Sequence, residues 1–400
     1  MNTHVFTQTI GDCAALIRNG GLVSVPTETV YGLAGDGMNP EAVKKIYEVK
    51  GRPSVKPLSL MVSGKEDMPR YAAEIPDAAL FLADRYWPGP LTIVLKAQEV
   101  IPDIVLAGGN TVGLRCPDHP LTLQLIRDSG TALAAPSANL SGSKSPVCAQ
   151  DVLDVFDGKI EAVIDGGPCT LKTESTLIDL SSKPYRILRA GAVSEAELAD
   201  ALVEKMCVIG ITGVTGAGKT TALDFYKEKG ACVMDCDTLY HEMLSKPCSM
   251  IDEILEHFPT VRDEAGGIDR KKLGEIVFHD QNELEILNTI THRYVLDEVK
   301  QWLGRRALEG YEIAAVDAVE LISGGLSRFC DYTIAVLASR DNRVLRIMKR
   351  DAIDREHAEQ RIAAQKSDDY YKENCTFVVY NDSGTEAFRN ELYKIDRSVN

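Results

Sequence analysis

The sequence lacks the features that would place it in a membrane or direct it out of the cell. Its 400 residues contain no apolar run that approaches the roughly 18 residues needed to span a bilayer. The N-terminus, Met1-Asn2-Thr3-His4-Val5-Phe6, has no basic segment followed by an apolar core, so we expect neither a signal peptide nor a membrane anchor. The sequence therefore favours a cytoplasmic protein with no membrane partner.

Metal-binding cysteine patterns are also missing. The ten cysteines are scattered, none forms a C-x-x-C pair, and the closest couple, Cys232 and Cys236, has no histidine cluster beside it. This spacing argues against a zinc site. In a chain of this length, scattered cysteines are typical of buried thiols in a reducing cytoplasm.

The chain also carries no excess of positive charge. The net charge is −15, and both halves of the chain carry more acidic than basic side chains. A broad basic face for duplex nucleic acid is therefore not expected, although this balance still leaves room for local basic pockets.

The length and the pattern of apolar segments predict two α/β domains. Four hundred residues exceed a typical single domain, and two domains of about 200 residues are the natural expectation. Apolar segments alternate with helix-like ones throughout, and Ser194 with Glu197 three residues later predicts an N-capped helix over 194–205. We place the first domain at 1–192, a short helical linker at 193–206 and the second domain at 207–400.

The most informative stretch is Gly213 to Thr220, which fits G-x-x-x-x-G-K-[ST] without a mismatch. It follows the apolar run 207–212 and leads into a helix, the order of a nucleotide phosphate cradle. The glycines let backbone N–H groups converge on phosphate oxygens, and the helix N-terminus adds a favourable dipole. Lys219 would reach the β- and γ-phosphates of ATP, and the Thr220 hydroxyl would hold Mg²⁺. The residues expected around this ATP are Gly213, Gly216, Ala217, Gly218, Lys219, Thr220 and Thr221.

Further strands are expected over 230–235, 313–316, 332–337 and 377–380, with helices between them. This order predicts a parallel sheet covered on both faces. Asp235 and Asp237 follow the second strand, where ligands bind in such sheets, and they could activate an acceptor hydroxyl and organise Mg²⁺. The alternative is that they cap a helix.

A run of cations over 340–350 follows the expected strand at 332–337. It suits a lid that closes over phosphates, with Arg343 and Arg350 supplying transition-state charge. Arg361 and Gln365 follow in the same region. The alternative is a solvated helix face, which we expect for Arg346 and Lys349.

Residues 210–384 resemble the dephospho-coenzyme A kinase family. The resemblance rests on I-T-G-V-T-G-A-G-K-T-T, V-M-D-C-D-T-L-Y, G-G-I-D-R-K-K-L-G-E-I-V-F, L-N-T-I-T-H, R-I-A-A-Q and Y-N-D-S-G, in the family's order and spacing. It implies a P-loop kinase domain with a helical lid that transfers the γ-phosphoryl group of ATP to the 3′-hydroxyl of dephospho-CoA. The family's proposed base falls on Asp237, and its lid arginines fall near Arg343 and Arg350.

The chain departs from this family at three places. His241 stands where the family often has Arg, and Arg293 stands where Pro usually follows the histidine. The family's apolar segment after the third strand appears here as 317–322, Asp-Ala-Val-Glu-Leu-Ile.

The first half places cations beside loops rich in hydroxyl and amide groups. By residue type alone, this set suits a nucleoside triphosphate together with a small zwitterion, although the polar segment 26–33 could equally be ordinary turn chemistry. The segments P-T-E-T-V-Y-G-L, K-G-R, W-P-G-P-L-T, S-A-N and E-S-T, spread over residues 10–191, resemble the threonylcarbamoyl-AMP synthase family. That resemblance implies a twisted α/β sheet with a concave, positively charged cavity.

The resemblance also implies substrates and residue roles. The family uses ATP, bicarbonate and L-threonine and releases pyrophosphate, and its product passes to a separate threonylcarbamoyl transferase complex that modifies tRNA. Lys50 and Arg52 would neutralise the triphosphate and the departing pyrophosphate. The residues expected to hold threonine, ATP or the adenylate are Thr27, Lys50, Arg52, Arg115, Ser137, Asn139, Ser145, Ser175 and Arg189. The histidine that family members often carry after a P-L segment is replaced within Leu58-Ser59-Leu60-Met61-Val62.

The sequence thus predicts a bifunctional enzyme, a threonylcarbamoyl-AMP synthase joined to a dephospho-CoA kinase, with ATP as a substrate at both sites. The alternatives left open are an N-terminal module that binds double-stranded RNA without catalysis, and a C-terminal kinase for another nucleoside-like acceptor. The acidic balance weighs against the first alternative, because affinity for a phosphate backbone depends on delivered cations.

Overall fold

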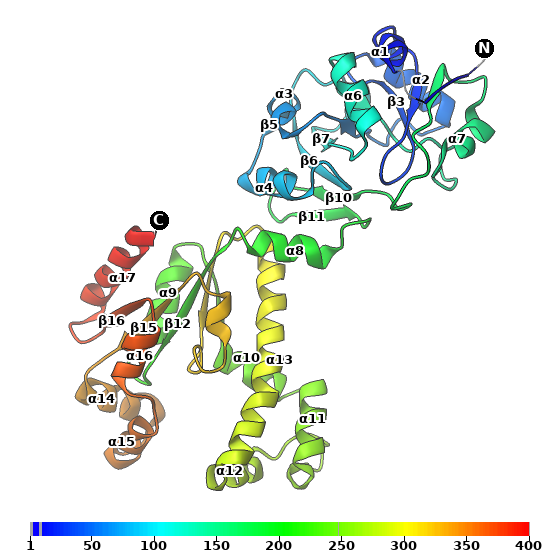
Figure 1. Ribbon diagram of the computed structural model, residues 1–400. Coiled ribbons are helices and arrows are strands. Elements are labelled where there is room, and N and C mark those ends of the chain that lie inside the picture. Colours follow the sequence, from blue (N-terminus) through cyan, green and yellow to red (C-terminus); the bar gives the residue numbers. More distant parts are fainter. Residues whose placement is uncertain (1–2, 8–9, 247, 400) are drawn as a thin grey trace. The chain divides into compact units, whose positions relative to one another are not determined.

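The chain folds into two compact α/β units, described here from a computed structural model that covers residues 3–7, 10–246 and 248–399 (Figure 1). The first unit comprises Met1–Lys205 with Leu308–Gly310, and the second comprises Met206–Ala307 with Tyr311–Asn400. The capped helix expected over 194–205 forms as α8 (Glu195–Val203), with a capping box between Ser194 and Glu197. It packs against α4 (Asp77–Tyr86) of the same unit. That the segment 193–206 acts as a linker stays a prediction.

The first unit is built on one mixed sheet. In spatial order its strands are β1 (His4–Phe6), β9 (Ala162–Ile164), β2 (Val23–Val25), β3 (Gly32–Asp36), β8 (Leu133–Ala134), β4 (Leu60–Met61), β7 (Thr111–Arg115), β6 (Leu91–Ala97), β10 (Thr176–Asp179) and β11 (Arg186–Arg189). β5 (Ala72–Glu74) pairs with β6 off this path. The apolar segments near 22–26, 91–95, 162–165 and 176–180 thus form β2, β6, β9 and β10 of this sheet.

Helices cover this sheet and bury apolar side chains against it. They are α1 (Gly11–Arg18), α2 (Pro40–Lys50), α3 (Met68–Tyr71), α4, α5 (Asp103–Leu106), α6 (Pro120–Ser129), α7 (Ala149–Phe156) and α8. The α1 helix packs beside α6 and places Ile17 in a cluster with Val23 and Val25 of β2. Alternating strands and amphipathic helices thus close one apolar core, as an α/β sequence pattern requires.

The second unit has a five-stranded sheet in which every strand pair is parallel. Its spatial order is β13 (Cys232–Asp235), β14 (Ile313–Asp317), β12 (Cys207–Gly213), β15 (Tyr332–Leu337) and β16 (Phe377–Tyr380). The expected parallel sheet is confirmed. The strand that leads into the glycine-rich segment, β12, is central, so its loop opens at the middle of the carboxyl edge, where ligands bind in open α/β sheets.

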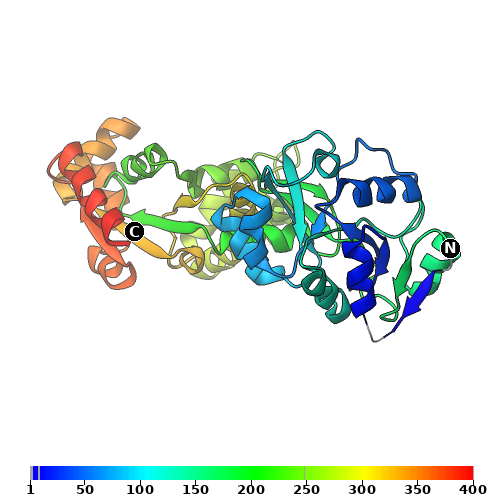
Figure 2. The same ribbon diagram turned by 90° about the horizontal axis from the view of Figure 1, so that it is seen from above.

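The helices of the second unit include one that is much longer than the rest. They are α9 (Lys219–Glu228), α10 (Cys236–Met243), α11 (Ser249–His257), α12 (Arg270–His279), α13 (Gln281–Leu308), α14 (Arg340–Asp351), α15 (Arg355–Ala363), α16 (Asp368–Asn374) and α17 (Thr385–Val399). Figure 2 shows that the segments after β15, coloured orange to red, gather at one end of this unit. No helix in the described part of the chain is apolar over a length that could cross a bilayer.

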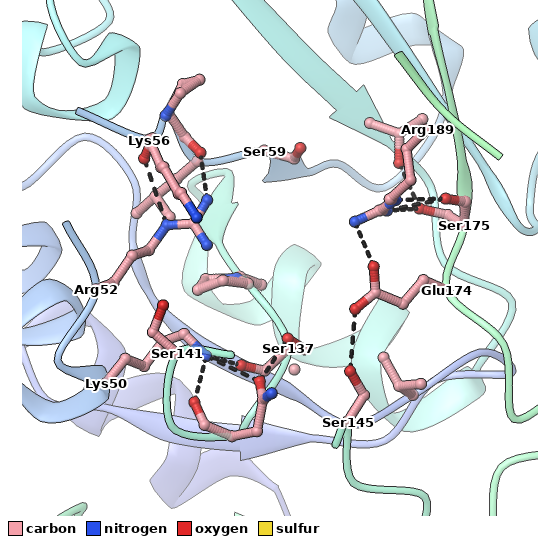
Figure 3. Close-up of a pocket in the computed structure, with 18 of the residues that line it drawn as sticks. Lys50, Arg52, Lys56, Ser59, Ser137, Ser141, Ser145, Glu174, Ser175 and Arg189 are labelled. Carbon is pink, nitrogen blue, oxygen red and sulfur yellow. Dashed lines mark hydrogen bonds and ion pairs between the residues drawn. The ribbon is translucent and has the colours of Figure 1, made fainter. Parts of the chain in front are cut away.

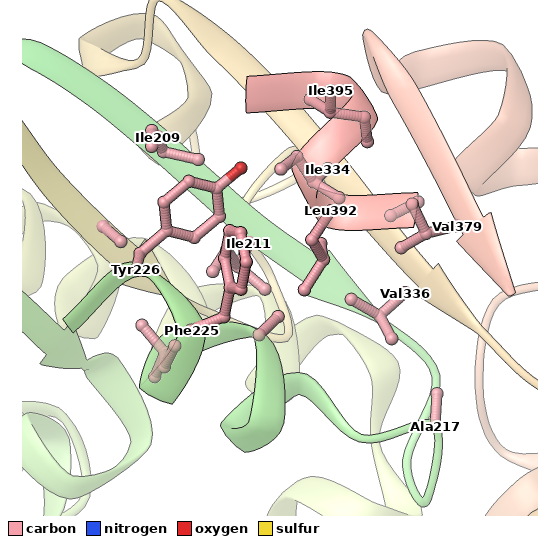
Figure 4. Close-up of a cluster of buried hydrophobic side chains, with 14 of the residues drawn as sticks. Ile209, Ile211, Ala217, Phe225, Tyr226, Ile334, Val336, Val379, Leu392 and Ile395 are labelled. Atoms are coloured by element: carbon pink, nitrogen blue, oxygen red, sulfur yellow. The ribbon is translucent and has the colours of Figure 1, made fainter. Parts of the chain in front are cut away.

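The core of the second unit lies between β12, β15, β16 and two helices (Figure 4). Phe225 and Tyr226 of α9 are fully buried and meet edge to face, with ring centroids 5.1 Å apart. They pack with Leu392 and Ile395 of α17 in one apolar cluster. This packing fixes α9, whose first turn carries the end of the glycine-rich segment.

Candidate functional sites

The first unit contains a polar cavity of about 330 Å³ (Figure 3). Segments far apart in the sequence line it, from Val30 and Gly32 at the start of β3 to Arg189 at the end of β11. Eight of the nine synthase residues expected from the sequence line this cavity: Lys50, Arg52, Arg115, Ser137, Asn139, Ser145, Ser175 and Arg189. A cavity with several fixed cations suits a polyanionic ligand.

Lys50 is the last residue of α2 and is almost fully buried. Its ammonium donates to the carbonyl oxygens of Ser137 and Asn139 and, at 3.2 Å, to Asn139 Oδ1. Burial, with a smaller contribution from nearby Arg52, lowers the pKa of Lys50 to about 8, although Glu174 acts in the opposite direction. The lysine therefore fixes the 137–139 loop of the cavity, and its charge is held in place by protein oxygens.

Arg52 follows the left-handed residue Gly51, whose φ of 57° ends the helix and turns the chain. Its guanidinium donates to the Pro57 carbonyl at 2.9 Å and to the Lys56 carbonyl at 3.4 Å. Burial lowers its pKa, and Arg189 adds to this effect. The two carbonyl contacts orient the guanidinium beside the cavity, where a triphosphate would gain from a fixed cation.

Arg189 and Glu174 form an ion pair of 2.6 Å on another wall of the cavity (Figure 3). Glu174 also accepts a hydrogen bond from the Ser145 hydroxyl at 3.0 Å. Arg189 donates to the Ser175 carbonyl and, at 2.9 Å, to the Ser175 hydroxyl. One connected network thus holds four polar groups in the cavity wall.

Arg115 and Thr27 make most of their hydrogen bonds to neighbouring protein groups. Arg115 is buried, and its Nη2 donates to Glu28 Oε1 at 2.7 Å and to Thr29 Oγ1 at 2.8 Å. The Thr27 hydroxyl donates to the Val30 carbonyl and accepts from two backbone N–H groups of the same turn. Thr27 does not line the cavity. The structure therefore favours the turn-forming alternative for Thr27, because its hydroxyl is fully used inside the turn.

Some cavity residues were not expected from the sequence. Lys56, Ser59, Ser141 and Ser143 line the cavity with the expected set. Lys56 comes four residues after Arg52, and Ser141 and Ser143 follow the S-A-N segment, so proximity in sequence to the recognised motifs was the available signal for these three. Ser59 lies in the segment 58–62, where the sequence lacks the family's histidine.

In the second unit, the glycine-rich segment forms a tight loop between β12 and α9. Gly213, Gly216 and Gly218 have φ angles of 128°, 80° and 105°, a region that glycine reaches without strain. A Cβ on Gly213 would lie 2.1 Å from the Val336 carbonyl oxygen, so no other residue fits there. The loop therefore has the backbone that a phosphate cradle needs.

Side chains from α14 and the residues after it clamp the outer side of this loop. Arg343 is buried and donates to the Thr215 carbonyl at 3.1 Å and to Gln365. Arg346 donates to the carbonyls of Gly216 and Ala217, each at 3.2 Å. The side chains of Arg343, Arg346 and Gln365 thus hold the backbone of the loop, and Gln365 also accepts from the Thr215 N–H at 2.9 Å.

This arrangement corrects one expectation about the basic helix. Arg346 is no solvated charge, because its guanidinium binds loop carbonyls that lie outside its own helix. Arg350 instead pairs with Asp351, which also binds Arg361, so the structure does not bring Arg350 to the loop. Its role in closing over phosphates stays a prediction.

The carboxyl ends of β13 and β14 bring acidic groups near Lys219. Asp235 caps α10 by accepting from the N–H groups of Asp237 and Thr238, so it plays the capping role that was left open. The Asp237 carboxylate opens into a second cavity. Desolvation by the surrounding protein, with nearby Asp235, raises the pKa of Asp237, while Lys219 and His241 oppose the shift.

Asp317, the last residue of β14, is a functional candidate that the motifs did not single out. It is buried, and within the described residues its Oδ1 has no hydrogen-bond partner. Burial raises its pKa to about 7, and Asp235 and Asp237 add to the shift while Lys219 opposes it. An isolated aspartate at a strand end has no spacing pattern by which the sequence could reveal it.

These groups suit Mg²⁺. Thr220 lies in the first turn of α9, and the unpartnered oxygen of Asp317 is a hard ligand of the kind that this ion prefers. Among the described residues, no three His, Cys, Asp or Glu side chains gather as a metal site. In nucleotide enzymes Mg²⁺ binds through one or two protein groups, water and substrate phosphates.

The second cavity has a volume of about 190 Å³ and begins at Asp237. It lies between α10, α13 and the turn after β14. Asp237, Asn288, Thr291, His292 and Glu320 give this cavity its polar groups.

Together, the two folds and cavities define a two-part α/β protein: a cationic, hydroxyl-lined cavity in the first unit and a P-loop nucleotide site in the second. A family model for Sua5, YciO and YrdC proteins, described as "Telomere recombination", matches residues 15–191. A model described as "Dephospho-CoA kinase" matches residues 207–387. The chain belongs to the threonylcarbamoyl-AMP synthase family and carries a dephospho-CoA kinase domain in its C-terminal half.

Named relatives support this assignment for the first half. A threonylcarbamoyl-AMP synthase of Pyrococcus abyssi is 47% identical over 185 residues, which are 46% of this chain and 54% of that protein. A putative threonylcarbamoyl-AMP synthase of Methanocaldococcus jannaschii is 37% identical over 183 residues, which are 46% of this chain and 86% of that protein. The chain spans about half the length of the P. abyssi protein, and about half the length of a threonylcarbamoyl-AMP synthase of Bacillus subtilis.

A solved structure is similar too. The crystal structure of P. abyssi Sua5 in complex with L-threonine is 28% identical with a TM-score of 0.49, and the match covers 84% of this chain and all of that one.

Proposed function

We propose that the chain is a bifunctional enzyme that forms L-threonylcarbamoyl-AMP in its first unit and phosphorylates dephospho-CoA in its second. The observation that supports the first activity is the cationic cavity with its hydroxyl-bearing walls, in a chain of the synthase family. The second activity is supported by the clamped P-loop beside Asp237 and Asp317, in a domain matched by the kinase model.

In the first unit, the amine of L-threonine would attack CO₂ derived from bicarbonate and lose a proton to give a carbamate. A carbamate oxygen would then attack the α-phosphorus of ATP and expel pyrophosphate. Arg52 and Arg189 lie where fixed cations would stabilise charge that develops on the departing group. Lys50 would act mainly by positioning, because its ammonium already binds the oxygens of the 137–139 loop.

In the second unit, the loop N–H groups and Lys219 would hold the ATP phosphates, while Asp237 would accept the proton of the acceptor's 3′-hydroxyl. That oxygen attacks the γ-phosphorus, the bond to ADP breaks, and the proton goes to the carboxylate. Thr220 and Asp317 would hold Mg²⁺, directly or through water, and the ion would neutralise charge on the β- and γ-phosphates. Arg343 fixes the loop for this task.

The partners that follow are ATP, L-threonine, bicarbonate and dephospho-CoA, with a separate transferase complex that would take the threonylcarbamoyl group to tRNA. A reducing compartment, the cytoplasm, suits a chain of this length whose ten cysteines are scattered along the sequence.

The test uses the full-length protein and two separate readouts. Pyrophosphate release from ATP should require both threonine and bicarbonate, and ADP formation should require dephospho-CoA. Pyrophosphate release without a need for threonine would exclude the synthase, and ADP formation that ignores dephospho-CoA would exclude the kinase. Each result stands alone, since the two readouts report different bonds of ATP.

A further inference from the structure

The second cavity has a wall that departs from the apolar segment implied by the kinase resemblance. The turn over 319–325, directly after β14, supplies this wall and carries Glu320. Glu320 therefore places a carboxylate in the cavity that begins at Asp237.

The backbone of this turn is held firmly. The Gly324 N–H donates to the Glu320 carbonyl at 2.7 Å, and a Cβ on Gly324 would lie 2.6 Å from that oxygen. Leu321, the next residue, is fully buried, with its side chain 2.7 Å from the place of a Cβ on Gly210. Because Gly324 and Leu321 are both held in place, the fold sets the position of the Glu320 backbone.

The carboxylate itself is oriented by one contact. The Ser323 hydroxyl donates to Glu320 Oε2. Glu320 Oε1 has no hydrogen-bond partner among the described residues. One oxygen is thus anchored and the other remains available as an acceptor.

His292 of α13 lies against the same turn, its Cδ2 3.6 Å from the place of a Cβ on Gly324. It lines the cavity and is half-buried, and within the described chain its imidazole makes no hydrogen bond. Burial lowers its pKa, and Glu320 opposes this shift. A neutral imidazole and a carboxylate therefore border one side of the cavity.

The remaining surface of the cavity is mostly apolar. Its apolar residues are Leu287, Val295, Ala318, Val319 and Leu326. An apolar slot with hydrogen-bonding groups on one side suits a flat heterocycle with a polar edge. Asp237 at the same cavity would touch the sugar hydroxyl that receives the phosphoryl group, so the ring beside it is the base on that sugar.

We propose that Glu320 determines the base of the acceptor nucleotide by accepting a hydrogen bond from the exocyclic amine of adenine. Adenine presents an amine donor at this position, whereas the deaminated base, hypoxanthine, presents a carbonyl acceptor that a carboxylate repels. Selection by Glu320 rests on the proposed kinase activity of this unit. It adds a specificity determinant that belongs to this chain's own departure at 317–322.

The experiment compares dephospho-CoA with its deaminated, hypoxanthine-containing analogue in the full-length protein. Calorimetric titration measures binding of each compound, and ADP formation measures turnover of each. The variants are Glu320→Gln and, as a matched control, Glu386→Gln on exposed α17. Glutamine keeps the size of glutamate, but its amide can either accept from an amine or donate to a carbonyl.

The wild type and Glu386→Gln should bind the adenine compound about 10- to 100-fold more tightly, the range for a hydrogen bond to a charged group. Glu320→Gln should bring the two affinities within about threefold, because its amide can either accept from an amine or donate to a carbonyl. Equal binding of both compounds by the wild type, or full discrimination in Glu320→Gln, would overturn base selection.

The two readouts separate the hypotheses. If the protein bound the adenine compound selectively but formed no ADP, the kinase activity would be excluded and base selection would be supported. ADP formation with equal efficiency on both compounds would retain the kinase and overturn base selection. Absence of binding to either compound would overturn both.

Discussion

Asp317 of β14 and Asp235 of β13 are paired in register at the carboxyl ends of two neighbouring parallel strands. Asp237 follows two residues after Asp235, and the charge of Lys219 acts on both Asp237 and Asp317. The three carboxyl groups differ in their surroundings: Asp235 caps a helix, Asp317 has a buried oxygen with no hydrogen-bond partner among the described residues, and Asp237 lines the second cavity. In the proposed reaction, Asp317 would help to hold Mg²⁺ and Asp237 would act on the acceptor hydroxyl.

Asp237→Asn should lower phosphorylation of dephospho-CoA by roughly 10²–10⁴-fold, the range for loss of a general base. Asparagine keeps the size but cannot take the hydroxyl proton. ATP affinity should change little, since the loop backbone, Lys219 and Thr220 supply the ATP contacts. Single-turnover phosphorylation beside direct ATP titration checks this. A near-normal rate would leave Asp237 only a structural role, and a loss of ATP affinity with the chemical rate preserved would make it a metal ligand.

Lys219→Ala should abolish ADP formation and leave threonine-dependent pyrophosphate release intact. The lysine is a local charge on one triphosphate, and the other activity belongs to a different unit. Lys227→Ala, on the exposed side of the same helix, is the control. If both activities fell together in a folded Lys219→Ala protein, the assignment of two independent sites would be wrong.

Arg52→Ala should have the converse effect. It removes an oriented cation from the cavity of the first unit, and loss of one preorganised donor typically costs about 3 kcal/mol, or about 10²-fold in rate. Threonine-dependent pyrophosphate release is the measurement, and Lys44→Ala on the exposed face of α2 is the control. Unchanged release in Arg52→Ala would reduce this residue to a surface charge.

Binding of ATP to the first unit should take up protons at alkaline pH. The free protein holds Lys50 with a pKa of about 8, and a bound triphosphate raises it, so uptake begins as the pH rises through 8 and is absent near pH 6. Calorimetry in buffers of different ionisation enthalpy measures this uptake, with Lys219→Ala used to silence the second site. Proton release in this range, or uptake that persists in Lys50→Met, would contradict the expectation.

Phe225→Ala should destabilise the second unit by about 3–5 kcal/mol, the range for truncating a fully buried phenylalanine. Phe225 packs among β12, α9 and α17, so thermal unfolding of the second unit should shift while that of the first stays put. Differential scanning calorimetry resolves the two transitions. A shift of the first transition alone would mean that the core assignment is wrong.

Local sequence patterns predicted the elements of this fold well. The strands and the capped helix were predictable because each depends on nearby residues: alternating apolar runs, or the Ser194–Glu197 pair. The P-loop was predictable because its chemistry is contiguous. The kinase motifs led to Asp237 in the same way.

Residues whose partners are distant in sequence were harder to place. Arg346 contacts carbonyls about 130 positions away along the chain, so helix periodicity could not reveal its role. The family resemblance placed Thr27 among the ligand-binding residues, but its hydroxyl donates to the Val30 carbonyl inside its own turn. Asp317 gains its character from burial beside Asp235, which no single-strand pattern shows.

In the first cavity, the carboxylate of Glu174 already pairs with Arg189, so it would compete with an anionic ligand for that guanidinium. An anion that binds Arg189 has to displace this carboxylate, and the carboxylate returns when the anion leaves. The net affinity is therefore a difference between two ion pairs. In the proposed synthase reaction, the carboxylate of Glu174 would weaken the capture of a polyanion at Arg189 and would speed its release by the same amount of free energy.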